Sequence, residues 1–250
     1  MIDLACIYMV WLRDVIRYFR EKSQFYGSMT RPVLWLFILG LGLRGGYQQV
    51  GNVNYTQFIF PGIVAMTSIF TSIQSAISII WDREFGFLKE ILVAPVPRTS
   101  IVIGKGFAGT TLSLIQGCII LLLAPLVRVK LPLINILPLL LVMAVMSFAL
   151  TGIGIVIAAR MTSFQGFGTI MNFVIMPMWF LSGALFPMKG IPWWLNILVR
   201  INPLTYGVDL VRRLVLGFSF YPLWFDLGFL IIFSVITTVA AVYFFNRGEY

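Results

Sequence analysis

Residues 133–159 read LINILPLLLVMAVMSFALTGIGIVIAA, a stretch without a charged side chain between Lys130 and Arg160. An α-helix rises about 1.5 Å per residue, so about 20 apolar residues cross the hydrocarbon core of a bilayer. The stretch exceeds this minimum, and charges flank it where lipid headgroups would lie. It therefore predicts a membrane-spanning helix, and five further runs of the same character lie on either side of it.

The five further predicted spans are residues 32–43, 58–81, 101–126, 164–186 and 223–245. The run 32–43 is short, so we expect it to begin near Gly27, with Arg31 snorkelling to the headgroups. Lys105 is expected to snorkel at the start of 101–126, and Pro177 to kink 164–186. Six spans place both termini on one side, and the excess of Lys and Arg there predicts that this side is cytoplasmic.

The composition agrees with a multi-pass membrane protein. Hydrophobic residues make up 60% of the chain and charged residues 11%, whereas soluble domains have about 45–50% and about 25%. The chain has no histidine and two cysteines, so we predict neither a histidine-based active site nor a metal site. The net charge of +9 indicates attraction to anionic membrane lipid, not nucleic acid, because the basic residues flank apolar runs.

Residues 3–24 are predicted to form an amphipathic helix in the membrane interface. Its apolar face carries Leu4, Ile7, Tyr8, Trp11, Val15 and Phe19, and its polar face carries Arg13, Arg17, Arg20, Glu21 and Gln24. A Trp-bearing apolar face opposite an Arg-rich face suits a helix lying at the headgroup boundary. The alternative is an ordinary packed helix, which the span that follows so closely disfavours.

A charged stretch separates the spans 58–81 and 101–126. Residues 81–98 read WDREFGFLKEILVAPVPR, in which Glu84, Leu88, Ile91 and Leu92 fit one short helix that Pro95 ends. A rigid charged helix between two spans can transmit force from a soluble partner. A plain connecting loop explains the same residues equally well, so both interpretations stay open.

Three motifs carry a resemblance to a known family. The first is Arg83-Glu84-x-Gly86 with 92–95 (LVAP), Arg98 and Gly104-Lys105; the second is 181–187 (LSGALFP) with 192–194 (PWW); the third is 202–206 (NPLTY) with Asp209 and Arg212. In this order the chain resembles the type-2 ABC transporter permeases of the daunorubicin-resistance and nodulation-export kind. The resemblance covers nearly the whole chain.

The resemblance implies an all-α membrane protein, a single transmembrane domain over 1–250. It would have six transmembrane helices, an N-terminal interfacial helix and an outer re-entrant helical hairpin within 187–220. The segment 82–98 would hold a coupling helix that docks on a separate ABC ATPase. The implied contacts to that ATPase are Arg83, Glu84, Phe85, Phe87, Leu88, Glu90, Leu92 and Pro95.

The resemblance also implies that two permease copies, expected to form a homodimer, pair around a path with two ATPase copies beneath. A phosphate-binding loop G-x-x-x-x-G-K-[ST] is absent, because Gly106 follows Gly104-Lys105 and Thr99 stands at the first glycine position. We therefore expect no cofactor on this chain, no enzymatic activity of its own, and ATP and Mg on the ATPase.

Two sets of polar residues are candidates for the translocation path. They are Thr67, Thr71, Gln74 and Ser78 in one span, and Gln165, Thr169 and Asn172 in another, where Thr162 clusters with them. Polar side chains in spans face protein or water. They can equally form interhelical hydrogen bonds worth about 0.6 kcal/mol each, so their role stays open. No firm mid-span charge is predicted, which favours a large amphipathic or lipid-like substrate over ions.

The sequence therefore predicts the permease subunit of an ATP-driven exporter in the cell inner membrane. The expected substrate is drug-like, a lipid or a lipid-linked glycan; polysaccharide or teichoic acid is the alternative. A different class is an integral-membrane lipid-modifying enzyme, for which Asp82, Glu84 and Glu90 form the only dense group of carboxylates. An ion channel or secondary carrier is disfavoured by the lack of mid-span charges and internal repeats.

Overall fold

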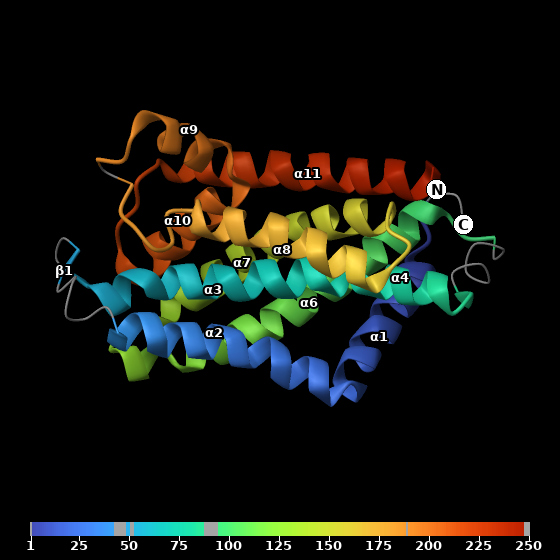
Figure 1. The fold of residues 1–250 in the computed structure, drawn as a ribbon, viewed down its shortest axis with the longest axis horizontal. Helices are drawn as coiled ribbons and strands as arrows, with labels where there is room; N and C mark the ends of the chain where they lie inside the picture. The colour runs from blue at the N-terminus through green and yellow to red at the C-terminus, as the bar shows by residue number, and fades with distance from the viewer. Residues whose placement is uncertain (1, 43–48, 51–52, 88–94, 189, 248–250) are drawn as a thin grey trace.

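A computed structural model describes residues 2–42, 49–50, 53–87, 95–188 and 190–247. Long helices run side by side along one axis (Figure 1). The start of α1 (Leu4–Arg20) and the end of α11 (Leu223–Arg247) lie at the same end as α4 (Ile77–Glu84), which we call the α4 end. At the opposite end, the α9 end, lie α9 (Trp193–Ile201) and α10 (Pro203–Leu216).

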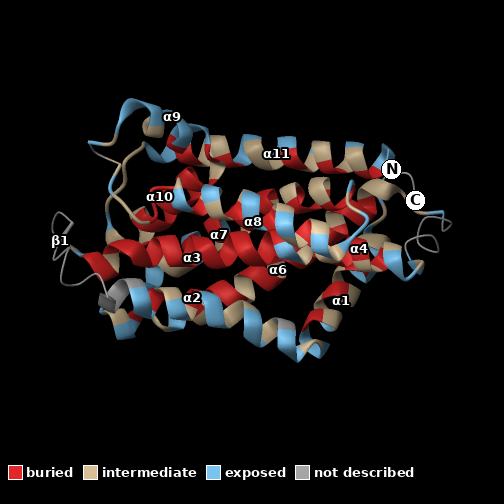
Figure 2. Cartoon of the chain, viewed as in Figure 1, coloured by how far each residue is buried: buried red, intermediate tan, exposed pale blue. Residues whose placement is uncertain are grey.

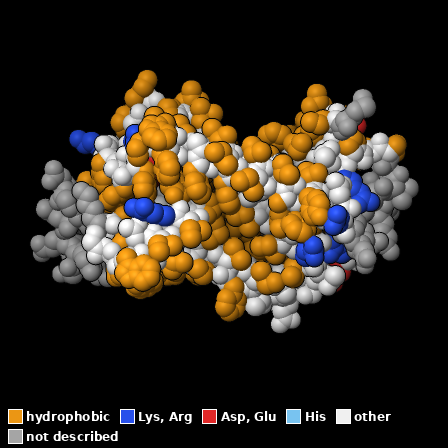
Figure 3. Space-filling view, turned by 90° about the horizontal axis from the view of Figure 1, so that it is seen from above, with side chains coloured by type: hydrophobic (Ala, Val, Ile, Leu, Met, Phe, Trp, Pro, Cys, Tyr) orange, Lys and Arg blue, Asp and Glu red, His pale blue; other side chains and the backbone are white. Residues whose placement is uncertain are grey.

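Within the described part of the chain, four helical stretches are long and apolar enough to cross a membrane. They are Tyr55–Glu84, which joins α3 (Tyr55–Ser75) to α4, then α6 (Arg98–Leu122), α7 (Leu133–Ala158) and α11. Hydrophobic side chains cover much of the middle of the face in Figure 3, and Lys and Arg lie toward the two ends. The chain is therefore a predominantly helical membrane protein, as the sequence predicts.

Two predicted spans differ from the helices observed. α8 (Phe164–Phe180) has 17 residues and ends before residue 186. Pro177 lies in the last turn of α8, so its predicted position in the middle of a span is wrong, and the kink that it should cause stays a prediction. α2 (Lys22–Gly42) begins earlier than the predicted start near Gly27.

The predicted interfacial helix 3–24 is also shorter than expected. The Asp3 carboxylate caps α1 by accepting from the Ala5 and Cys6 amides. α1 ends at Arg20, and Lys22 already belongs to α2. A two-residue antiparallel ladder, β1 (Gln49–Val50) with β2 (Val53–Asn54), adds strand structure that the all-α prediction lacked.

α3 forms the centre of the bundle. Its residues are buried almost continuously to Ile73 (Figure 2). It contacts α2, α6, α7, α8 and α10, whereas α11 keeps an exposed apolar face that includes Ile232 and Val239. An apolar face left uncovered on a spanning helix belongs against lipid.

A close approach between α7 and α3 depends on Gly154. A Cβ added there would lie 2.7 Å from the Ile73 carbonyl oxygen and 3.0 Å from the Ala76 Cβ. Backbone atoms cannot move aside cheaply, and overpacking costs about 1–3 kcal/mol. We expect Gly154→Ala to lower the midpoint of thermal unfolding in detergent.

Gly168→Ala is the matched control, because no atom lies within 4 Å of its added Cβ. In a helix this substitution should be neutral or stabilise by about 0.5–1 kcal/mol. Equal melting of the two variants would contradict the packing described for Gly154.

Candidate functional site

The predicted coupling stretch lies at the α4 end, and its described part exposes two aromatic rings. α4 ends at Glu84, and Gly86 adopts a positive φ of 76° that turns the chain. Phe85 is 71% exposed and Phe87 42%, so large apolar groups face outward beside the charged Glu84. Exposed aromatic side chains of this kind are typical anchors of protein interfaces.

The predicted coupling residues do not all share this exposed position. Arg83 points back into the bundle, where it donates to the Ala159 carbonyl at 3.1 Å and to the Met161 carbonyl. Glu84 ends α4 and is separated from Phe87 by the Gly86 turn, so the predicted helix starting at Glu84 is wrong in its first turn. Pro95 is exposed. Leu88, Glu90 and Leu92 lie outside the described residues.

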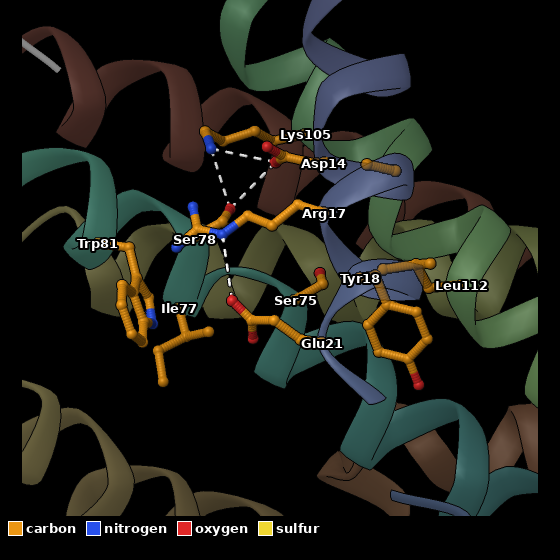
Figure 4. Close-up of a pocket in the computed structure, with 11 residues that line it drawn as sticks. Asp14, Arg17, Tyr18, Glu21, Ser75, Ile77, Ser78, Trp81, Lys105 and Leu112 are labelled. Atoms are coloured by element: carbon orange, nitrogen blue, oxygen red, sulfur yellow. Dashed lines mark hydrogen bonds and ion pairs between the residues drawn. The ribbon is translucent and has the colours of Figure 1, made fainter. Parts of the chain in front are cut away.

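A buried cluster of charges lies where α1, α4 and α6 meet, and Figure 4 shows Lys105, Asp14 and Ser78 of this cluster pointing toward one another. Lys105 Nζ lies 3.1 Å from Asp14 Oδ2, 3.0 Å from Asp82 Oδ2 and 2.9 Å from Ser78 Oγ. The side chains of Lys105, Asp14 and Asp82 are 2%, 7% and 4% exposed. Lys105 therefore does not snorkel to headgroups, and the sequence prediction for it is wrong.

Two arginines of α1 complete the buried charge cluster. Arg13 Nη2 lies 2.6 Å from Asp82 Oδ2 and 2.9 Å from Asp14 Oδ1, and Arg17 Nη1 lies 3.5 Å from Asp82 Oδ1. Burial opposes ionisation of Asp14, but Lys105 and Arg13 outweigh it and hold its pKa below the usual carboxyl value. The cluster thus joins α1, α4 and α6 through ion pairs.

Sequence reasoning did not predict this cluster. Asp14 lies next to Arg13 in an Arg-rich helix, and Asp82 and Lys105 lie at span ends on either side of the coupling stretch. A charge at span level must find a partner. That rule marks the three residues as candidates for pairing but does not assign their partners.

The candidate path residues of α3 and α4 do not share one environment. Thr67 donates to the Ile63 carbonyl at 3.0 Å within its own helix. Thr71 donates to the Gln116 side-chain oxygen, which joins α3 to α6. Ser78 belongs to the buried charge cluster. Only Gln74 of the four is exposed.

The candidate path residues of α8 share one exposed face. Gln165, Thr169 and Asn172 are all exposed, as is Thr162 just before the helix. Thr169 donates to the Gln165 carbonyl at 3.0 Å. A polar face exposed on a helix packed among membrane spans requires water or another protein surface beside it.

A cavity of about 260 Å³ lies between α1, α2, α3 and α6. Its lining includes Gln74 and Thr71, together with Tyr18, Gly27, Ser28, Arg31, Pro32, Phe70, Ser75 and Leu112. The Arg31 guanidinium lies over the Phe70 ring, 4.3 Å from its centroid. Arg31 thus faces a cavity beside α3, and its predicted snorkelling to the headgroups is wrong.

Comparison with known proteins settles the family. The family described as ABC-2 type transporter matches residues 5–216. The chain belongs to the ABC-2 type transporter family. It is a permease subunit of an ABC transporter.

Individual relatives cover most of the permease. It is 30% identical over 232 residues to nodulation protein J of Rhizobium leguminosarum bv. trifolii, covering 91% of this chain and 87% of that protein. It is 30% identical over 212 residues to the transport permease ycf38 of Cyanophora paradoxa, covering 83% of this chain and 73% of that protein. The probable multidrug ABC transporter permease YbhR of Escherichia coli is 30% identical to this chain over 200 residues, covering 78% of this chain and 54% of that protein.

The second and third motifs of the permease meet at the α9 end. Arg212 Nη2 donates to the Gly183 carbonyl at 2.6 Å, and Arg212 Nη1 lies 3.3 Å from Asp209 Oδ1. Asp209 also accepts from the Phe220 and Tyr221 amides at 2.9 Å. Both charged side chains are fully buried. Their spacing in the sequence thus reflects one hydrogen-bonded unit that fixes α10 on the 181–187 segment.

Proposed function

We propose that the chain is the membrane-spanning subunit of an ATP-driven exporter, with six transmembrane helices and α2 and α8 as the two spans beyond the four long apolar ones. The α4 end faces the cytoplasm with both termini, in the cell inner membrane. The α9 end faces outward, with α9 and α10 as the re-entrant hairpin. The membership in the ABC-2 family and the arrangement of the helices support this orientation.

One observation carries the proposal: the exposed turn at Glu84, Phe85 and Phe87 backs onto the buried charge cluster. A separate ATPase, in two copies with ATP and Mg, binds the turn in this proposal. The cluster ties the turn to α1 and α6 through Asp82. A push on the turn is thereby passed to three helices, because separating buried ion pairs would leave uncompensated charges.

We place the translocation path along the exposed polar face of α8 and the cavity beside Gln74. Two permease copies, as a homodimer, would cover these faces and enclose the path. The substrate is an amphiphile: a drug-like molecule, a lipid or a lipid-linked glycan. Relatives named as a nodulation protein and as a multidrug permease support this range.

The test is reconstitution of the permease with its ATPase in proteoliposomes. We expect ATP-dependent flux of a fluorescent amphiphile only when both chains are present, and faster ATP hydrolysis by the ATPase when the permease is added. Flux driven by an ion gradient through the permease alone would contradict the proposal and favour a channel or secondary carrier.

The same preparation tests the alternative of a lipid-modifying enzyme. Asp82, one of the three carboxylates that such an enzyme would use, is held by Lys105 and Arg13 in the buried charge cluster. We therefore expect the permease alone to leave phospholipids chemically unchanged, as measured by mass spectrometry of the extracted lipid.

A further inference from the structure

The cavity between α2 and α3 contains a cation that no described carboxylate neutralises. Arg31 is exposed toward this cavity, and its contact among the described residues is the Phe70 ring. The ring face attracts the guanidinium but accepts none of the strong in-plane hydrogen bonds that its five N–H groups can donate. The donor edge of Arg31 is therefore available to a ligand.

The depth of Arg31 separates it from ordinary interfacial arginines. Phe70, on which it lies, is about 21 Å along the α3–α4 span from its end at Glu84 and about 22 Å from its other end at Tyr55, at about 1.5 Å per residue. The hydrocarbon core is about 30 Å thick, so both ends of this span reach its boundaries. Arg31 thus lies near the middle of the crossing, where an arginine is costly and marks a functional site.

Two cations that are buried among the described residues each have a carboxylate partner. Lys105 has two carboxylates within 3.1 Å, and Arg212 has Asp209 at 3.3 Å. Arg31 differs from both, because it is exposed toward the cavity and has no such carboxylate among the described residues. Packing alone does not account for an arginine that is left without a counterion.

The remaining lining defines the shape and polarity of the ligand. The Gln74 side chain is exposed and forms no hydrogen bond with a described residue, so its amide can donate to the same ligand. Tyr18 and Ser28 are already bonded to each other at 2.9 Å and to Gln116. Phe70, Pro32 and Leu112 supply apolar walls.

We propose that this cavity binds the anionic headgroup of an amphiphile, a phosphate or carboxylate to which the Arg31 guanidinium donates two hydrogen bonds. Arginine matches the geometry of these oxyanions with two parallel hydrogen bonds. A volume of about 260 Å³ holds a headgroup, whereas sites for whole drug-sized ligands occupy about 300–1,000 Å³. The acyl chain extends into the lipid. That the amphiphile is the transported substrate rests on the function proposed above.

The test measures binding without ATP, on the permease purified with its ATPase in neutral maltoside detergent. The probes are dodecyl phosphate and dodecanoate, with dodecyltrimethylammonium as the cationic control. We expect both anions to bind and Arg31→Gln to raise their dissociation constants by about tenfold or more, as a lost charge-assisted pair does. Arg31→Lys should retain part of the affinity.

Arg20→Gln is the matched control, because Arg20 is an exposed arginine of α1 outside the cavity lining. It should leave both dissociation constants unchanged. If Arg31→Gln fails to fold, Gln74→Leu, at an exposed position, should still weaken anion binding about threefold. Equal binding of the anions to wild type, Arg31→Gln and Gln74→Leu would overturn the proposal.

A second measurement separates the two sources of the anion. If Arg31→Gln abolishes both anion binding and ATP-driven flux, the occupant is a transported amphiphile; if flux persists, it is a resident membrane lipid. Both results support the anion site. If the wild type shows no ATP-dependent flux but its anion binding still depends on Arg31, the exporter function is contradicted and the anion site is supported.

Discussion

Replacement of Phe85 and Phe87 by glutamate is expected to uncouple the permease from its ATPase. The two rings are the largest exposed apolar groups in the described part of the turn at the α4 end. Aromatic anchors at an interface cost about 2 kcal/mol or more when removed, which is about 30-fold in affinity. We expect co-purification of the ATPase to be lost and permease-stimulated ATP hydrolysis to fall at least tenfold.

The matched control keeps the turn apolar. Phe85→Leu with Phe87→Leu retains buried apolar area at the interface and should preserve most of the stimulation. Phe85 stacks on Trp81 and Phe87 lies under the Arg13 guanidinium, 5.0 Å from the ring centroid. The leucine variant keeps apolar contact at both positions, so it should leave the melting midpoint of the permease alone close to that of wild type. Full stimulation by the double glutamate variant would show that the ATPase binds elsewhere.

The four long spans could be predicted from the sequence because lipid imposes a simple rule on it. A long uncharged apolar run such as 133–159 forms a membrane-spanning helix, and α7 occupies 133–158 of it. The shorter helices follow more local rules. α8 ends at Phe180 in a turn over residues 181–183, in which Gly183 has a positive φ of 68°, and hydropathy does not detect such a turn.

The pairing of charges could not be predicted, because it depends on which helices become neighbours. Lys105 lies 91 residues from Asp14 in the sequence and 3.1 Å from it in the fold. Hydropathy treats a lysine near a span end as a snorkelling side chain. Only the packing of α1 against α6, which the sequence does not specify, turns that lysine inward.

The environment of polar side chains in the spans also could not be predicted from the sequence. Thr67, Thr71, Gln74 and Ser78 share a helix face, and the helical period predicts this much. Their neighbours differ: Thr71 meets Gln116 of α6, whereas Gln74 meets an open cavity. The period assigns a side chain to a face of its helix, but the neighbouring helices decide whether that face is a contact or a path.

Replacement of Lys105 by methionine is expected to be the most destabilising single change in the bundle. Lys105 is 2% exposed and lies within 3.1 Å of both Asp14 and Asp82. Removing one partner of a buried ion pair costs about 3–5 kcal/mol, because the remaining charges stay buried. Arg13 still neutralises part of the two carboxylates, so we expect about 3 kcal/mol, seen as a lower unfolding midpoint in detergent.

Asp14→Asn supplies the control for this mechanism. If the cost arises from uncompensated charge, Lys105→Met with Asp14→Asn should be more stable than the sum of the two single changes predicts, by about 1 kcal/mol or more. Strict additivity would assign the loss to packing instead.

The pH dependence of the buried charge cluster follows from Asp14. Its pKa is lower in the folded protein than in the unfolded chain. The contribution of Asp14 is therefore fully present above the ordinary aspartate value of about 3.9 and is lost as the pH falls below it. We expect the stability difference between wild type and Asp14→Asn to stay constant from about pH 7 to about pH 5 and to shrink below about pH 4. A difference that already disappears between about pH 7 and pH 5 would mean that Asp14 is not held in its charged form by Lys105 and Arg13, and the proposed link between the exposed turn and α1 would lose its physical basis.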